Sequence, residues 1–136
     1  MVDELAAVVS DTHPLIFYAA RQRSLSKSAL AHFQACERQE KLIYIPAAVI
    51  WETCLLVRRN RINLRRSARE FFSDLFSNPA FQPLELDHEH IYIASEIHPN
   101  DDPFDGLICA AALSLGLPLI TRDSDITGSG LVEIIW

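Results

Sequence analysis

Short apolar runs alternate along the chain with longer stretches whose apolar residues recur at helical spacing. Residues 6–10 are rich in β-branched side chains and end in a polar serine, a pattern typical of a buried strand. In residues 26–39, Leu30, Phe33 and Cys36 lie three positions apart, as on one face of a helix. These two patterns predict strands at residues 6–10, 43–45, 81–86, 119–121 and 131–135, and helices after Pro14 and at residues 26–39, 47–59, 64–76, 89–97 and 103–115.

The last of these helices has the clearest boundaries. Asp102 is a favourable N-cap, Pro103 suits the first helical position, and Gly116 follows Leu115 as a helix terminator. Strands that alternate with helices predict a parallel sheet covered on both faces, because parallel neighbours need crossover connections. We therefore expect an α/β fold, a three-layer α/β/α sandwich with a central parallel sheet, formed by a single domain over residues 1–136.

Four acidic residues lie at the polar edges of the apolar segments. Asp11 and Asp123 come just past the carboxyl ends of predicted strands, whereas Glu52 and Asp105 lie near the starts of predicted helices. Ligands of open parallel sheets bind at this carboxyl edge, so we expect the four acids to converge. An ionised carboxylate near an apolar core must protonate, pair with a base or bind a cation. Oxygen-only ligands favour Mg²⁺ or Mn²⁺ over zinc.

Each acid also has a structural interpretation. Asp11 could cap a short helix, Asp105 could complement a helix dipole, and Asp123 with Asp125 could belong to a turn. Glu52 is the hardest to explain in this way, because residues 49–57 leave almost no polar face on their helix. The metal hypothesis therefore rests on the four positions taken together.

Composition narrows the class of protein. With 49% hydrophobic and 22% charged residues, the sequence is typical of a soluble globular protein. No apolar stretch is long enough to span a membrane, and the N-terminus lacks the basic region of a signal peptide, so we expect a cytoplasmic protein with no membrane contact. Cys36, Cys54 and Cys109 are odd in number and far apart, which favours buried free thiols. No glycine-rich phosphate loop is present, and we assign the histidines to surface or loop positions.

Charge is distributed unevenly. The net charge of −6 argues against a protein that binds nucleic acid through charge alone. Half of the 12 Lys and Arg residues are nevertheless arginines between positions 58 and 69, which predicts a basic helical patch. Such a patch could guide an RNA backbone or receive an acidic protein segment, or it could be a solvated helix face. The arginines that we single out for these contacts are Arg58, Arg59, Arg65 and Arg66.

Four motifs together carry a family resemblance. They are Val-Val-Ser-Asp11-Thr12, Ile45-Pro46 followed by Glu52, Asp102-Pro103-Phe104-Asp105 with its apolar continuation, and Gly116-Leu-Pro-Leu-Ile-Thr121-Arg-Asp123. In these motifs the chain resembles the PIN-domain nucleases, of the kind found as VapC-type toxins of bacterial toxin–antitoxin pairs. The motifs span nearly the whole chain, and the segment from Asp102 to Asp123 is the most specific.

The resemblance implies a metal-dependent endoribonuclease. Asp11, Glu52, Asp105 and Asp123 would be the catalytic residues and would bind one or two Mg²⁺ or Mn²⁺ ions, with Thr121 supporting the last acid and Asp125 as an additional acid. RNA would be the substrate, a cognate antitoxin the protein partner, and a homodimer the assembly, for which Ile16, Phe17 and Tyr18 offer apolar surface. Gly106 stands where many relatives carry Arg.

Two other classes of function remain open. A non-catalytic PIN-like module that binds nucleic acid or protein would be expected to lack one or more of the acids, and all four are present. A metal-dependent phosphatase commonly carries a D-x-D motif after its first strand, and Asp11-Thr12-His13 lacks the second Asp.

Overall fold

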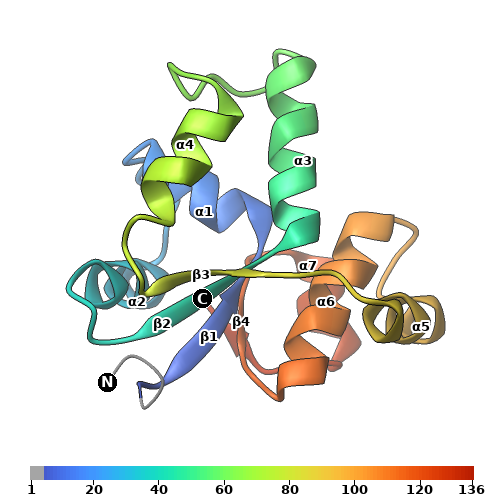
Figure 1. Ribbon diagram of the computed structural model, residues 1–136. Coiled ribbons are helices and arrows are strands. Elements are labelled where there is room, and N and C mark those ends of the chain that lie inside the picture. Colours follow the sequence, from blue (N-terminus) through green and yellow to red (C-terminus); the bar gives the residue numbers. More distant parts are fainter. Residues whose placement is uncertain (1–4) are drawn as a thin grey trace.

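The computed structural model describes residues 5–136, so residues 1–4, which belong to the segment that argued against a signal peptide, lie outside it. Its five strands form one sheet in the order β3-β2-β1-β4-β5, and every neighbouring pair is parallel (Figure 1). The strands are β1 Ala7–Ser10, β2 Leu42–Pro46, β3 Phe81–Leu84, β4 Leu119–Ile120 and β5 Ile134–Ile135. The helices are α1 Thr12–Ala19, α2 Lys27–Glu37, α3 Ala47–Arg58, α4 Ala68–Leu75, α5 His88–Ile97, α6 Pro103–Leu115 and α7 Ser124–Ser129.

Strand β1 lies at the centre of the sheet. Its Val9 pairs with Tyr44 of β2 on one side and with Leu119 of β4 on the other, and its side chain is fully buried. In Figure 1, α3 and α4 rise above the sheet, whereas α5 and α6 lie together at one end of the view. The predicted three-layer α/β/α fold with a central parallel sheet is therefore confirmed. The largest fully buried apolar side chains include those of Leu15, Phe33, Ile43, Ile45, Ile108, Leu119 and Ile126.

Helix α6 has the boundaries that the sequence predicts. The Asp102 carboxylate accepts a hydrogen bond from the Phe104 amide at 2.9 Å, and Pro103 occupies the first turn. Gly116 ends the helix with φ of 65°, a left-handed conformation that costs glycine little because it has no Cβ. This cap places Asp105 in the first turn of α6, which faces the carboxyl edge of the sheet.

We predicted a basic helical patch in the arginine-rich segment, but most of this segment lies between two helices. Helix α3 ends at Arg58, and α4 begins only at Ala68, because the Ser67 side chain caps it by accepting the Glu70 amide at 3.1 Å. Between the two helices the chain turns twice through positive φ, at Asn60 and at Arg65. Four of the six arginines consequently lie on an exposed loop.

The segment after β4 also differs from the prediction. The structural alternative for Asp123 and Asp125 was a turn, and no helix was predicted there, but residues 124–129 form the short helix α7. The Asp123 carboxylate caps it by accepting the Ile126 amide at 2.9 Å, and Ile126 is fully buried. A capping aspartate and a single buried anchor residue are enough to convert this polar turn sequence into a helix.

The cysteines follow the sequence prediction in part. Cys36 and Cys109 are buried, Cys54 is half-buried, and all three are free thiols. Burial raises the pKa of the Cys36 and Cys109 thiols to about 12, so both remain protonated near neutral pH. None of the helices in residues 5–136 is both long and apolar enough to cross a membrane.

Candidate functional site

Asp11 stands at the carboxyl end of the central strand and is 6% exposed. One carboxylate oxygen accepts the Thr12 amide at 2.7 Å, and the other accepts the Thr121 hydroxyl at 2.7 Å. Burial raises the pKa of Asp11, although both hydrogen bonds act in the opposite direction. Asp11 is therefore a desolvated carboxylate held in place by neutral donors.

Glu52 lies on α3 and is half-buried. Its Oε1 accepts a hydrogen bond from the Thr12 hydroxyl at 2.5 Å. Burial is the main cause that raises the pKa of Glu52, and the charges of Asp11 and Asp102 add to it. Because the amide of Thr12 binds Asp11 and its hydroxyl binds Glu52, this one fully buried residue links the two acids.

Asp105 is buried in the first turn of α6. Its Oδ2 accepts the Asn100 side-chain amide at 2.7 Å, and the same amide lies 3.4 Å from Asp125 Oδ2. Burial is the main cause that raises the pKa of Asp105 to about 7, and the negative charges of Asp11, Asp102 and Asp123 act in the same direction. Asp105 thus lies within the electrostatic field of two other predicted site acids.

Thr121 joins the last acid to the first. Its hydroxyl donates to Asp11 and accepts the Asp123 backbone amide at 3.0 Å, which sets the path of the chain into α7. Asp123 is half-buried, and its carboxylate caps α7, whereas Asp125 is exposed in the first turn of that helix. Thr121 therefore contacts the carboxylate of Asp11 and the backbone of Asp123.

The structure brings the four predicted acids, Asp11, Glu52, Asp105 and Asp123, to one edge of the sheet, which we call the acid edge. The hydrogen bonds of Thr12 and Thr121 connect three of them, and Asp105 lies within the electrostatic field of Asp11 and Asp123. No ion pair within residues 5–136 joins any of these four carboxylates to Lys, Arg or His. In the same residues, no three Asp, Glu, His or Cys side chains are close enough to share one metal ion. The carboxylates instead face threonine, asparagine and backbone donors.

Three residues of this edge were not predicted from the sequence. Thr12 and Asn100 hold the acids directly. The only sequence signals for them are that Thr12 adjoins Asp11 and that Asn100 precedes Asp102, the cap of α6. His13 was assigned a surface role, and it is indeed exposed on α1. It nevertheless adjoins Thr12, the residue that binds both Asp11 and Glu52.

A cavity of about 560 Å³ opens beside His13. Its floor is apolar and is formed by Ile16, Phe17, Leu56 and Ile62. Its remaining lining is polar and is formed by His13, Gln22, Arg59 and Arg61. Of the residues proposed as partner surface, Ile16 and Phe17 are largely buried under this cavity at 6% and 8% exposure.

The remaining singled-out arginines make separate local contacts. Arg58 stacks over the Trp51 ring at 5.6 Å. Arg66 pairs with Asp74 at 3.2 Å and lies 5.7 Å from the Phe71 ring centroid. Arg65 is exposed on the loop between α3 and α4, and Arg59 lines the cavity. Of these four arginines, Arg59 alone lines the cavity beside His13.

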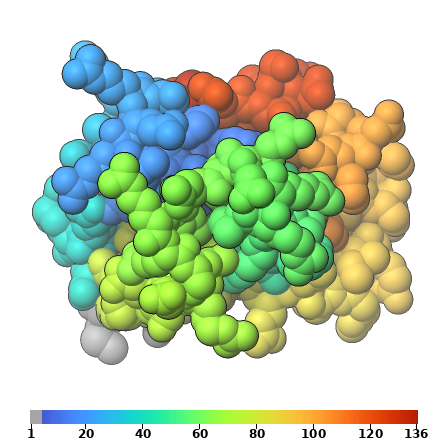
Figure 2. All heavy atoms as spheres, turned by 90° about the horizontal axis from the view of Figure 1, so that it is seen from above, coloured from blue at the N-terminus to red at the C-terminus, as the bar shows by residue number. Residues whose placement is uncertain are grey.

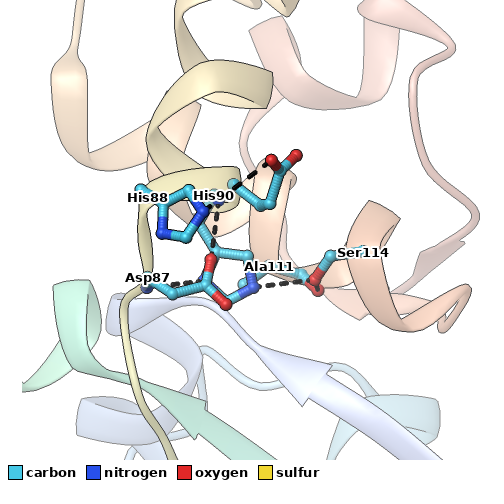
Figure 3. Close-up of polar contacts among 6 residues, drawn as sticks. Asp87, His88, His90, Ala111 and Ser114 are labelled. Carbon is cyan, nitrogen blue, oxygen red and sulfur yellow. Dashed lines mark hydrogen bonds and ion pairs between the residues drawn. The ribbon is translucent and has the colours of Figure 1, made fainter.

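A second polar cluster lies between α5 and α6 (Figure 3). The buried imidazole of His90 accepts the Asp87 amide at Nδ1 over 3.5 Å, and its Nε2 lies 2.9 Å from the Ser114 hydroxyl. The Ser114 hydroxyl donates to the Ala111 carbonyl at 2.9 Å, and the Asp87 carboxylate accepts the His90 amide at 3.0 Å. Although it contains Asp, His and Ser, this cluster caps α5 rather than activating a nucleophile, because the serine proton points to a carbonyl.

Comparison with known proteins identifies the fold. Residues 8–128 match the PIN domain family, and no curated protein matches the chain. Among solved structures, VapBC2 from Rickettsia felis bound to a promoter DNA fragment aligns with a TM-score of 0.69 at 11% identity, over 94% of this chain and 96% of that one. DNA-bound VapBC from Salmonella typhimurium gives 0.64 at 17% identity over 96% of both chains. FitAcB from Neisseria gonorrhoeae gives 0.63 at 19% identity over 93% of this chain and 95% of that one.

Proposed function

The chain belongs to the PIN domain family, and we propose that it is a metal-dependent endoribonuclease of the VapC type, the toxin of a toxin–antitoxin pair. The observation that supports this proposal best is the group of four acids at the carboxyl edge of the sheet. Three of them, Asp11, Glu52 and Asp105, have a raised pKa because they are buried, and no basic side chain of the described residues pairs with them. Such a group favours a bound cation.

The donor set fits Mg²⁺ or Mn²⁺. Asp11, Glu52, Asp105 and Asp123 offer carboxylate oxygens only, which hard divalent cations prefer. To bind a shared ion, the carboxylates would turn away from the Thr12, Thr121 and Asn100 donors that they now face. When bound, the cation would offset the phosphate charge and make a water molecule more acidic.

The surrounding residues would position these acids. Thr12 holds Asp11 and Glu52 in fixed relation, and Thr121 holds Asp11 beside the start of α7. Asn100 lies within reach of both Asp105 and Asp125, so it could follow either carboxylate when the site rearranges. Pre-positioning of this kind lowers the cost of ordering the site around substrate.

The partners follow from the same proposal. Several of the similar solved structures are described as toxin–antitoxin or VapBC complexes, and we propose a cognate antitoxin for this chain by analogy. A homodimer and a cytoplasmic location are proposed from the family resemblance of the sequence motifs. The exposed arginines on the loop between α3 and α4 would contact the RNA backbone or an acidic segment of the antitoxin.

Cleavage of a mixed single-stranded RNA in Mg²⁺, Mn²⁺ or EDTA tests the proposal. We expect cleavage in either metal and none in EDTA, with loss of activity in Asp11→Asn and Glu52→Gln. Glu96→Gln is the matched control, because Glu96 is exposed on α5. RNA should also bind more weakly in EDTA, since the acids repel phosphate when no cation offsets their charge.

Three outcomes would contradict the proposal. RNA binding without cleavage in any metal would favour a binding module. Turnover of a small phosphomonoester with no action on RNA would favour a phosphatase. Equal RNA affinity in Mg²⁺ and EDTA would show that the metal has no part in substrate binding.

A further inference from the structure

The cavity beside the acid edge combines three features of a binding site. Its volume of about 560 Å³ lies within the range of roughly 300–1,000 Å³ that small-ligand sites occupy. Its floor is apolar, with Phe17 and Leu56 as two of its members, and its remaining lining is polar or positively charged. An apolar base with a few polar groups around it suits a flat heterocycle that carries hydrogen-bonding edges.

We propose that this cavity is a nucleobase-binding subsite, which holds one base of the RNA next to the scissile bond and thereby sets the sequence preference of cleavage. The inference rests on the proposed nuclease function and adds a specificity-determining site to it. The exposed ring of His13 would provide aromatic surface for the base, and Gln22 would contact its hydrogen-bonding edge.

His13 provides the exposed aromatic ring of the cavity. Its centroid lies 6.0 Å from that of Phe17, with a tilt of 49°, so the two rings contact each other and a base would stack on the outer face of His13. The Arg122 guanidinium lies 4.6 Å from the Phe17 ring centroid. Bases of single-stranded RNA commonly stack on aromatic rings and on arginine planes of this kind.

Two lining residues of the cavity adjoin residues of the acid edge. His13 directly follows Thr12, whose hydroxyl donates to Glu52, and Leu56 lies about one helical turn after Glu52 on α3. Arg122, which stacks on Phe17, lies between Thr121 and Asp123 in the chain. A nucleotide whose base occupies the cavity would therefore place its phosphate near the carboxylates.

The charge of the lining favours nucleic acid. Arg59 and Arg61 line the side of the cavity formed by the loop after α3. On a chain with net charge −6, two arginines beside a group of acids provide local attraction for a phosphate that the acids themselves repel. Figure 2 shows atoms of α1 in blue and of α3 with its following loop in green on the same exposed face. Their accessibility suits a single strand that approaches from outside.

A substitution that fills the cavity tests the proposed subsite. Ile62→Trp places an indole in the cavity, whereas Ile91→Trp, at a position that is 50% exposed on α5, is the matched control. RNA oligonucleotides that vary at one position are cleaved under single-turnover conditions. Loss of base stacking is expected to lower kcat/KM for the preferred base by about 5- to 100-fold in Ile62→Trp and to reduce the preference among bases to within about twofold. Ile91→Trp should retain the wild-type kcat/KM and the wild-type preference among bases.

Cross-linking gives a readout that does not depend on catalysis. RNA that carries 4-thiouridine at the preferred position should cross-link to the tryptic peptide that ends at Arg21 and contains His13 and Phe17. Ile62→Trp should abolish this cross-link. Gln22→Ala, an exposed substitution that leaves the floor intact, should change which base is preferred without removing the cross-link.

The possible failures are distinguishable. If the wild-type protein cleaves RNA and Ile62→Trp keeps the same base preference, the subsite is wrong and the nuclease proposal stands. If Ile62→Trp loses affinity for an acidic peptide but keeps its base preference, the cavity belongs to a protein partner and the subsite is again wrong. If the wild-type protein cleaves no RNA in Mg²⁺ or Mn²⁺, both proposals fail together.

Discussion

Two groups of polar side chains are buried in this molecule, and they differ in how their hydrogen bonds are satisfied. In the cluster between α5 and α6, each polar side-chain group of His90 and Ser114 meets a hydrogen-bonding neighbour (Figure 3). At the acid edge, carboxylates lie within one another's field, and Asp105 has a pKa raised to about 7.

This difference distinguishes polar side chains that stabilise the fold from polar side chains that bind a ligand or perform chemistry. A satisfied cluster stabilises the fold and needs no ligand, because every donor has an acceptor. Neighbouring carboxylates without a basic partner weaken the fold, and burial of this kind is common where proteins bind cations or perform chemistry. If this separation is right, substitutions in the two regions should change different properties of the protein.

The acid edge should determine activity. We expect Asp11→Asn and Glu52→Gln to lower kcat/KM for RNA by at least about 100-fold, because each removes a charged ligand from the proposed metal site. Circular dichroism would check that both variants fold. Retained cleavage in either variant would contradict the assignment of that residue.

The cluster between α5 and α6 should determine stability alone. His90→Ala leaves Ser114 and the Asp87 amide without their partner, which we expect to cost about 1–3 kcal/mol in the free energy of unfolding. RNA cleavage at a temperature where the variant is folded should be unchanged. His88→Ala is the matched control, because the His88 side chain is 75% exposed. A fall in activity without a fall in stability would reverse our assignment of the two regions.

The acid edge should also make the metal-free protein less stable at high pH. The pKa of Asp105 is raised in the folded state from 3.8 to about 7, so the folded state binds its proton more tightly than the unfolded state does. This contribution to stability is complete below about pH 4 and is lost as pH rises through about 7. In EDTA, thermal melting should therefore occur several degrees higher at pH 5.5 than at pH 8, and Asp105→Asn should reduce the difference. Equal melting temperatures in wild type would contradict the raised pKa.

The loop arginines should have the smallest effect. Neutralising Arg65 and Arg66 is expected to weaken RNA binding and to reduce its dependence on salt concentration. The slope of log K against the logarithm of the salt concentration should fall in magnitude by about 0.7 for each RNA phosphate that is no longer contacted by an arginine. Arg38→Gln is the control, since Arg38 is exposed and pairs with Glu40. Unchanged binding would show that the loop is a solvated surface.

The sequence predicts local features well because the residues that determine them are adjacent. The boundaries of α6 follow from Asp102, Pro103 and Gly116. The acids follow from their places after strands, for Asp11 and Asp123, or near the starts of helices, for Glu52 and Asp105. The predicted start of α4 was wrong by four residues, because the apolar Leu64 continues a helical pattern although it packs against the core from a loop.

The remaining errors arise from contacts between distant segments. Helix α7 forms because Ile126 finds a buried place in the core, which the polar sequence around it does not indicate. The supporting roles of Asn100 and Thr12 depend on distances across elements, and no spacing in the chain reveals them. Sequence therefore predicts where the acids lie and not which neutral residues hold them.

The hydrogen bond between Thr121 and Asp11 joins residues that are 110 positions apart. A ribosome that adds about 5–20 residues per second needs roughly 5–20 seconds to travel from one to the other. Throughout that interval Asp11 has been synthesised, but the segment that completes its surroundings has not. The acid edge can therefore assemble only late in translation, after almost the whole chain has been synthesised.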